Sequence, residues 1–204
     1  MNTQTQETLR GIRKEFFAFR NGIVADTLRK AGDPHGMIIG CLLVDIIGIA
    51  SRFRTDIYDK EQLMAIASEL WSDTNSRECR LAAPMLYPAE EMSLELAITW
   101  CESVETVEVA DNLCHKLLRH IPEADSLFRQ LIAQENPLMK YTGYRLLLNL
   151  LLLGKVQPNA SLKAIVDTEA AQAEQPLKSL IKDILHDSLK SYTIIIHFIY
   201  PIKR

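Results

Sequence analysis

The first candidate for chemistry is an acidic side chain on an apolar helix face. On a helical wheel over residues 104–119, Asp111 falls inside the arc of apolar side chains, whereas Glu108 and Asn112 face elsewhere. A buried carboxylate must be paired, hydrogen-bonded or turned toward a groove, because an unpaired charge in an apolar site is costly. Asp111 is therefore a carboxylate presented to a cationic ligand, or else a partner in an internal ion pair or a helix-capping acceptor.

A basic side chain stands out in the apolar helix predicted over residues 138–153. The main polar strip of this helix consists of Thr142, Arg145 and Asn149, which are adjacent on the wheel. An arginine can hold a phosphate as a bidentate donor, or it can pair with a carboxylate such as Asp111. The pattern leaves a phosphate site and an internal ion pair open.

Other catalytic and metal-binding patterns are absent from the sequence. It holds no nucleotide-binding loop, HExxH helix, nucleophile elbow or catalytic cysteine–histidine signature. The four cysteines are widely spaced with no CxxC pair, so His115 and His120 lack the cysteines that would complete a zinc finger. We expect no metal, no cofactor, and reduced cysteines that pack between helices.

Composition and charge narrow the class of protein. The 204 residues are 48% hydrophobic and 24% charged, with a formal net charge of −3. These values predict one compact domain and exclude a disordered acidic tail or a strongly cationic nucleic-acid coat. The longest apolar stretches fall short of the ~20 residues that cross a bilayer. The polar amino terminus lacks a secretory signal, so we expect a cytoplasmic protein with no membrane contact.

The elements that must position these residues are helices. Only eight Gly and eight Pro occur, which argues against a β-sandwich, and apolar residues recur at intervals of three and four. Helices are predicted to begin near residues 60, 77, 90, 105, 123, 138, 160 and 176. Because they pair with a period of about 30 to 40 residues, we predict an all-α superhelix, an α-solenoid of HEAT-like (armadillo-type) hairpins. An irregular helical bundle is the alternative.

This predicted repeat domain is assigned to residues 1–190 as a single unit. The last segment, residues 191–204, differs from it because it is rich in β-branched and aromatic residues and is charged only at its last two positions. Such a segment favours aggregation when it is exposed. It is treated as an apolar C-terminal tail of unknown structure.

Three stretches resemble the AlkD-like DNA alkylation repair family, in order and spacing, over roughly residues 38–190. The first is the hairpin AIASELW…SRECRLAA over residues 65–83, the second is VEVADNLC over residues 107–114, and the third is NPL…YRL over residues 136–146. The family consists of HEAT-like repeat proteins and includes alkylpurine DNA glycosylases. The resemblance therefore implies double-stranded DNA as the partner.

The resemblance also implies roles for individual residues. In the family's glycosylases the carboxylate at the position of Asp111 stabilises positive charge on the sugar as a cationic alkylated purine departs, and the arginine at Arg145 holds a phosphate. The family's tryptophan falls on Val107, and the aromatic of its last matched helix falls near Lys182. Possible groove residues are Val107, Glu108, Tyr141, Tyr144, Asn149 and Lys182. The alternative function is a non-catalytic scaffold that binds a protein or DNA on its concave face.

Overall fold

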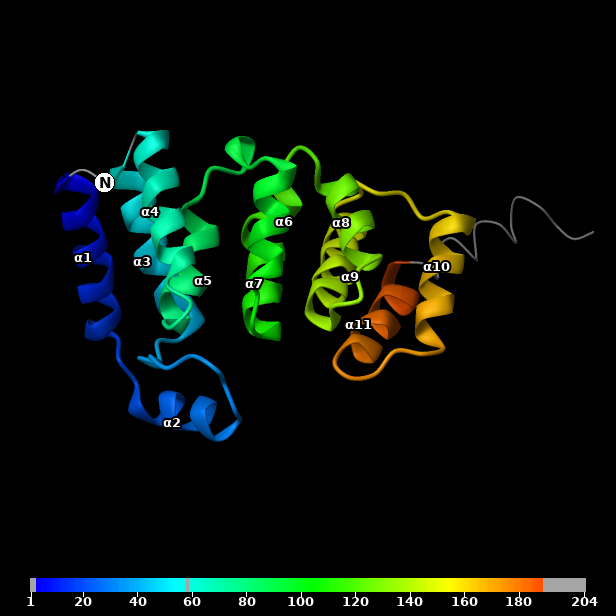
Figure 1. The fold of residues 1–204 in the computed structure, drawn as a ribbon, viewed down its shortest axis with the longest axis horizontal. Coiled ribbons are helices and arrows are strands. Elements are labelled where there is room, and N and C mark those ends of the chain that lie inside the picture. The colour runs from blue at the N-terminus through cyan, green and yellow to red at the C-terminus, as the bar shows by residue number, and fades with distance from the viewer. Residues whose placement is uncertain (1–2, 58, 189–204) are drawn as a thin grey trace, which may run out of the picture. The chain divides into compact units, whose positions relative to one another are not determined.

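A computed structural model describes residues 3–57 and 59–188, and the fold of these residues is all-α (Figure 1). The helices are α1 (Thr3–Ala18), α2 (Gly22–Lys30), α3 (Leu43–Asp56), α4 (Lys60–Ser72), α5 (Arg77–Leu86), α6 (Leu94–Glu102), α7 (Val107–Lys116), α8 (Ala124–Ile132), α9 (Pro137–Leu152), α10 (Ala160–Ala170) and α11 (Leu177–Asp183). None of these helices is long and apolar enough to cross a membrane. The predicted tail, residues 191–204, lies outside the described residues.

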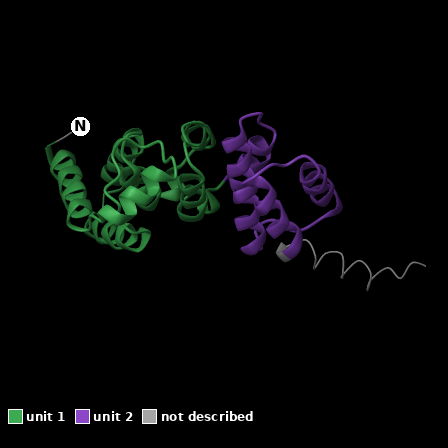
Figure 2. Ribbon diagram, turned by 90° about the horizontal axis from the view of Figure 1, so that it is seen from below, with its two compact units in different colours: residues 1–122 green, residues 123–204 purple. Residues whose placement is uncertain are grey.

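The chain divides into two compact units, residues 1–122 and residues 123–204 (Figure 2). Unit 1 therefore contains α1 to α7, and unit 2 contains α8 to α11. The expected all-α class is confirmed for the described residues. The single repeat domain over residues 1–190 and its solenoid arrangement stay predictions.

Helix α5 lies at the centre of unit 1. It packs against α3, α4 and α7, and every residue of α5 except Met85 is buried. Helix α1 packs against α3 and α4. Trp71 of α4 stacks on Trp100 of α6, with ring centroids 4.4 Å apart and planes 5° from parallel. Such aromatic pairs add to the stability gained from burial alone.

Side-chain caps decide where several helices begin. The predicted start near residue 90 is wrong for α6, because Pro88 leads into a short 3₁₀ turn, η1 (Ala89–Glu91). Helix α6 starts instead after Ser93, whose hydroxyl accepts a hydrogen bond from the Leu96 N–H at 3.2 Å. A serine at this position satisfies a backbone donor that the first turn leaves open.

Unit 2 is built on the pair α8 and α9, with α11 packed against both α9 and α10. Gly143 of α9 faces α8, where a Cβ atom would lie 2.8 Å from the backbone nitrogen of Ile132. Only a residue without a side chain allows the two helices to approach this closely. The sequence shows this glycine, but the contact that requires it is visible only in the fold.

A buried carboxylate organises the segment that precedes α3. Glu78 of α5 is fully buried and accepts hydrogen bonds from the backbone N–H groups of Ile39 (3.1 Å), Gly40 (2.9 Å) and Cys41 (3.2 Å). Gly40 has a φ of +86°, and a Cβ there would lie 2.1 Å from the carbonyl oxygen of Asn21. One acidic side chain therefore holds a tight bend against the start of α2.

We expect the substitution Glu78→Ala to lower the free energy of unfolding by about 3–5 kcal/mol, because it leaves three buried N–H groups without their acceptor and removes one of the two carboxylates that pair with buried Arg77. Urea denaturation followed by circular dichroism measures the change. Glu91→Ala is the control: this exposed carboxylate pairs with Lys60 at 3.0 Å, and its loss should cost less than ~1 kcal/mol. Equal losses in the two variants would contradict the structural role of Glu78.

We expect none of the four cysteines to react in the native protein. Cys41, Cys79, Cys101 and Cys114 are free and buried, and burial raises the pKa of the Cys41 thiol to about 12. Because the thiolate is the reactive form, a disulfide reagent at pH 8 should label no thiol in the folded chain and four in denaturant. Rapid labelling of a native thiol would count against this packing.

Candidate functional site

Two contacts set the rotation of α7, the helix that carries Asp111. Arg77 of α5 donates to Glu108 through both Nε (2.7 Å to Oε2) and Nη2 (2.5 Å to Oε1). One turn later, Asn112 donates from Nδ2 to the carbonyl oxygen of Leu81 at 2.7 Å. Asp111 lies between these anchors and is half-buried, so the backbone on both sides of the candidate carboxylate is tied to α5.

The helix that carries Asp111 is shorter than the sequence predicts. The wheel assumed one helix over residues 104–119, but α7 ends at Lys116, and the chain continues into the 3₁₀ turn η2 (Leu118–His120). Asn112, which the wheel turned away from the apolar arc, is buried. Glu108, a predicted groove residue, is engaged by Arg77, and Val107 is half-buried in the first turn.

Arg77 joins three segments of unit 1. Besides its contacts to Glu108, it donates from Nη1 to the carbonyl oxygen of Cys41 (3.2 Å) and to Oε1 of Glu78 (3.1 Å). Burial opposes the charged guanidinium, but the hydrogen bonds and charge of Glu108, with help from Glu78, hold the pKa of Arg77 above its ordinary value. The side chain therefore stays charged and connects α5, α7 and the segment before α3.

A second buried arginine holds the ends of α4 and α6. Arg80 donates to the carbonyl oxygen of Trp71 at 2.6 Å and to that of Ser103, and it lies 3.6 Å from the centroid of the Trp71 ring. Burial lowers the pKa of Arg80, and the carboxylate of Glu105 at 3.1 Å opposes this shift. The cation–π contact and the hydrogen bonds make Arg80 a packing residue.

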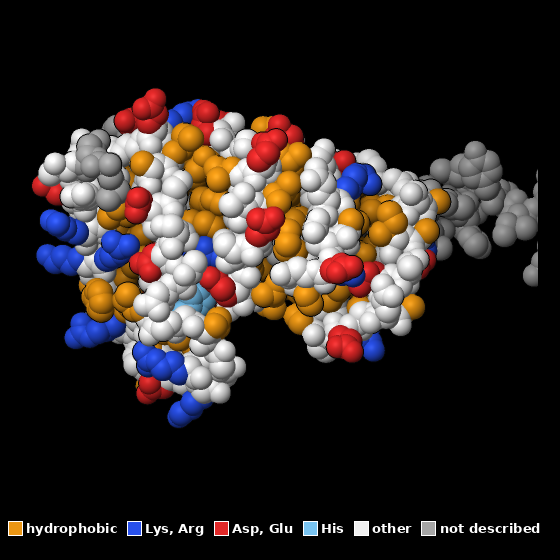
Figure 3. Space-filling view, viewed as in Figure 1, with side chains coloured by type: hydrophobic (Ala, Val, Ile, Leu, Met, Phe, Trp, Pro, Cys, Tyr) orange, Lys and Arg blue, Asp and Glu red, His pale blue; other side chains and the backbone are white. Residues whose placement is uncertain are grey.

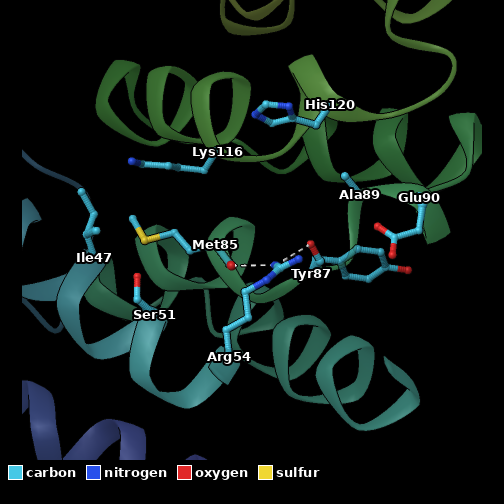
Figure 4. Close-up of a pocket in the computed structure, with 9 residues that line it drawn as sticks. All are labelled: Ile47, Ser51, Arg54, Met85, Tyr87, Ala89, Glu90, Lys116 and His120. Atoms are coloured by element: carbon cyan, nitrogen blue, oxygen red, sulfur yellow. Dashed lines mark hydrogen bonds between the residues drawn. The ribbon is translucent and has the colours of Figure 1, made fainter. Parts of the chain in front are cut away.

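A cationic hollow of about 380 Å³ lies at the C-terminal end of α7 (Figure 4). Its walls are formed by Ile47, Ser51, Arg54, Met85, Tyr87, Ala89, Glu90, Lys116 and His120. Lys116 and His120 face Arg54 and Ser51 across the opening. The acid in the wall, Glu90, pairs with Lys60 at 2.7 Å, so the uncompensated charge that faces the hollow is positive.

Arg54 lines the hollow and also stabilises the C-terminal end of α5. Its Nη1 donates to the carbonyl oxygens of Met85 (2.9 Å), Leu86 (3.3 Å) and Tyr87 (3.4 Å), at the end of α5. A cation there compensates the negative end of the helix dipole. Lys116 makes no ion pair with a described residue, so its charge is available to an anion in the hollow.

In unit 2, helix α9 presents Arg145 and Asn149 one turn apart on the same face. Arg145 is half-buried, and Asn149 is buried, with no acceptor for its Nδ2 group among the described residues. Buried amide donors without a partner are uncommon in folded proteins. The Nδ2 group of Asn149 is therefore an unsatisfied donor inside unit 2, whereas part of the Arg145 side chain reaches the surface.

The remaining predicted groove residues belong to unit 2. Tyr141 and Tyr144 are buried in unit 2, and burial, with the nearby charge of Glu169, raises the pKa of Tyr144 to about 12. Lys182 is exposed on α11. Asp111 belongs to unit 1 and Arg145 to unit 2. That the two side chains form one common site stays a prediction.

Sequence reasoning missed the roles of Arg77, Glu78 and Arg80. The signal was present: three charged residues stand within four positions of a helix that is otherwise apolar, and each must find a buried partner. The described residues contain no group of three His, Cys, Asp or Glu side chains that could hold a metal ion. Unit 1 therefore offers two separate features, the half-buried carboxylate of Asp111 and the cationic hollow, whose lining does not include Asp111.

The chain matches the family described as DNA alkylation repair enzyme over residues 12–182. Curated proteins and solved structures give no match. The matched range includes α7 with Asp111, α9 with Arg145, and every residue that lines the cationic hollow. It also covers most of the chain, and the chain therefore belongs to the DNA alkylation repair enzyme family.

Proposed function

We propose that this protein is a DNA glycosylase that excises cationic N-alkylated purines from double-stranded DNA. Family membership carries the proposal, and the anchoring of α7 supports it, because Asp111 is held on both sides by contacts to α5. In this proposal Asp111 stabilises positive charge on the sugar and Arg145 holds a phosphate. An acidic residue in this role needs a fixed orientation toward the charge that develops in the transition state.

The proposed reaction is hydrolysis of the bond between C1′ of the sugar and the alkylated base. The bonding electrons leave with the base, whose formal positive charge is neutralised, and positive charge develops on the sugar. The carboxylate of Asp111 stabilises this charge. Water then adds to C1′ and loses a proton to solvent, which leaves an abasic sugar and a neutral base.

Two features support contact with a phosphate backbone. In unit 1, the hollow of Figure 4 offers Lys116 and Arg54 at the end of the helix that carries Asp111. In unit 2, the half-buried side chain of Arg145 on α9 is partly exposed to solvent. Arginine and lysine side chains are among the groups that proteins use to contact phosphate oxygens.

Val107 limits how the lesion can be recognised. The resemblance places the family's tryptophan at this position, and a valine has no π-face. Val107 therefore cannot stack on the DNA or attract a cationic base through a cation–π contact. The proposed mechanism therefore relies on a leaving group that is already cationic. Bases such as 7-methylguanine and 3-methyladenine meet this requirement, whereas neutral adducts would need further activation.

We expect Asp111→Asn to reduce the release of 7-methylguanine from methylated duplex DNA by about 10²–10³-fold, because it removes the charge that stabilises the transition state. Single-turnover release of the free base measures the rate. Asp125→Asn, an exposed aspartate on α8 that pairs with Arg129 at 3.0 Å, is the matched control. No release by the wild type, or equal release by wild type and Asp111→Asn, would contradict the proposal.

We expect Lys116→Gln to weaken duplex DNA binding about eightfold at 0.1 M salt and to reduce the salt-dependence slope by ~0.9, the effect of one lost phosphate contact. Fluorescence anisotropy over a range of salt concentrations measures both quantities. Lys178→Gln, at an exposed position on α11, should leave the affinity and the slope unchanged. An unchanged slope for Lys116→Gln would remove the hollow from the proposed interface.

A further inference from the structure

One end of unit 1 exposes an unusual number of large apolar side chains. Nine such residues are exposed among the described residues, and six of them lie between positions 17 and 44. We call these six the α1–α3 patch: Phe17, Phe19, Ile23, Leu42, Leu43 and Val44, whose exposed fractions range from 38% to 82%. Exposed apolar clusters of this kind mark interaction surfaces in soluble proteins.

The segments that carry the patch residues come together because the turn between α1 and α2 is fixed against the segment before α3. The backbone N–H of Asn21 donates to the carbonyl oxygen of Ile39 at 3.1 Å, and Sγ of Cys41 donates to the carbonyl oxygen of Phe16 at 3.1 Å. Gly40 allows the close approach to Asn21. The end of α1, the start of α2 and the start of α3 therefore form one surface region.

Positive charge surrounds this region. Arg10, Lys14, Arg20 and Lys30 are exposed and form no ion pair with a described residue. Arg10, Lys14 and Phe17 follow one face of α1 at intervals of four and three. In Figure 3, hydrophobic side chains lie among Lys and Arg side chains at the lower left, where α1 meets α2.

The nearby acids are largely engaged by other cations. Glu15 pairs with Arg52 at 2.9 Å, and Asp26 pairs with Arg29 at 3.1 Å. Arg13 on α1 forms an ion pair with Asp73, which lies after α4, at 3.2 Å. Glu7 on α1 and the half-buried Asp45 next to Val44 form no ion pair with a described residue, so four such cations stand against two such acids and the net charge around the α1–α3 patch is positive.

An apolar centre with a cationic rim selects among binding partners. A second copy would set the same cations against each other, which is unfavourable. A phosphate backbone would satisfy the cations but not exposed Ile23, Leu42 and Val44, because phosphate contacts are polar. A protein segment that carries both acidic and apolar side chains would satisfy both parts of the surface.

We propose that the α1–α3 patch binds an acidic amphipathic segment of a partner protein. The apolar side chains of the segment contact Phe17, Phe19 and Ile23, and its carboxylates pair with the four unpaired cations at the rim. Recognition of apolar side chains at helical spacing by an apolar surface is a common mode of peptide binding. This interaction is separate from DNA binding, because it uses neither Asp111 nor the hollow of Figure 4.

The test selects peptides from a random 12-residue phage-displayed library on the full-length protein. We expect the selected peptides to be enriched in Asp and Glu together with Phe, Leu or Trp. Fluorescence anisotropy with the strongest synthetic peptide then compares variants. The double variant Phe17→Ser/Ile23→Ser should weaken binding at least tenfold, and Lys14→Gln/Lys30→Gln should weaken it severalfold and reduce its salt dependence.

Matched controls separate the patch from general effects. Leu152→Ser removes another strongly exposed apolar side chain, in unit 2, and Lys178→Gln removes another exposed charge; neither should change peptide affinity. The patch side chains are exposed, so the thermal midpoint should move by less than about 2 °C. Base release from methylated DNA should be the same in the patch variants and the wild type.

Three results would overturn the proposal. Selected peptides without acidic enrichment, or peptides that bind the double variant as tightly as the wild type, would exclude this partner chemistry. A dimer that sedimentation detects in the wild type but not in Phe17→Ser/Ile23→Ser would assign the patch to self-association. A loss of duplex DNA affinity in that variant would assign it to the nucleic-acid interface.

Discussion

The arrangement of unit 1 depends on two adjacent buried charges, Arg77 and Glu78. Glu78 gathers three backbone N–H groups before α3, while Arg77 reaches a carbonyl of the same segment and the carboxylate of Glu108 on α7. Each charge offsets the cost of burying the other, and further hydrogen bonds satisfy the remaining N–H donors of Arg77 and the carboxylate oxygens of Glu78. The position of Asp111 therefore depends on residues that lie more than thirty positions earlier in the chain.

The most recognisable sequence motif of this chain is structural. Arg77, Glu78 and Arg80 contact backbone carbonyls, N–H groups and the Trp71 ring, and they are buried. Asp111 and Arg145, which are proposed to act on DNA, lie on other helices, α7 and α9, and are only partly buried. Val107, where the resemblance places the family's tryptophan, is half-buried and makes none of the contacts of this internal charge network.

Much of the fold was accessible to sequence reasoning, and the site was less so. Helical periodicity and prolines gave the all-α class and most helix starts, because each depends on residues within one or two turns. The start of α6 was misplaced, since the cap at Ser93 outweighed the signal of Pro88. Asn112 was misjudged because its acceptor, the Leu81 carbonyl, belongs to another helix. The exposed α1–α3 patch also escaped notice, because periodicity alone does not reveal which apolar residues find a neighbour.

The stacked tryptophans give the protein an uneven set of spectroscopic reporters. Both tryptophans of the sequence, Trp71 and Trp100, belong to unit 1 and lie in contact there. Their fluorescence reports on the contact between α4 and α6 and does not report on unit 2. Far-ultraviolet circular dichroism reports on the helices of both units. If the two signals change at different denaturant concentrations, the units unfold as separate cooperative blocks.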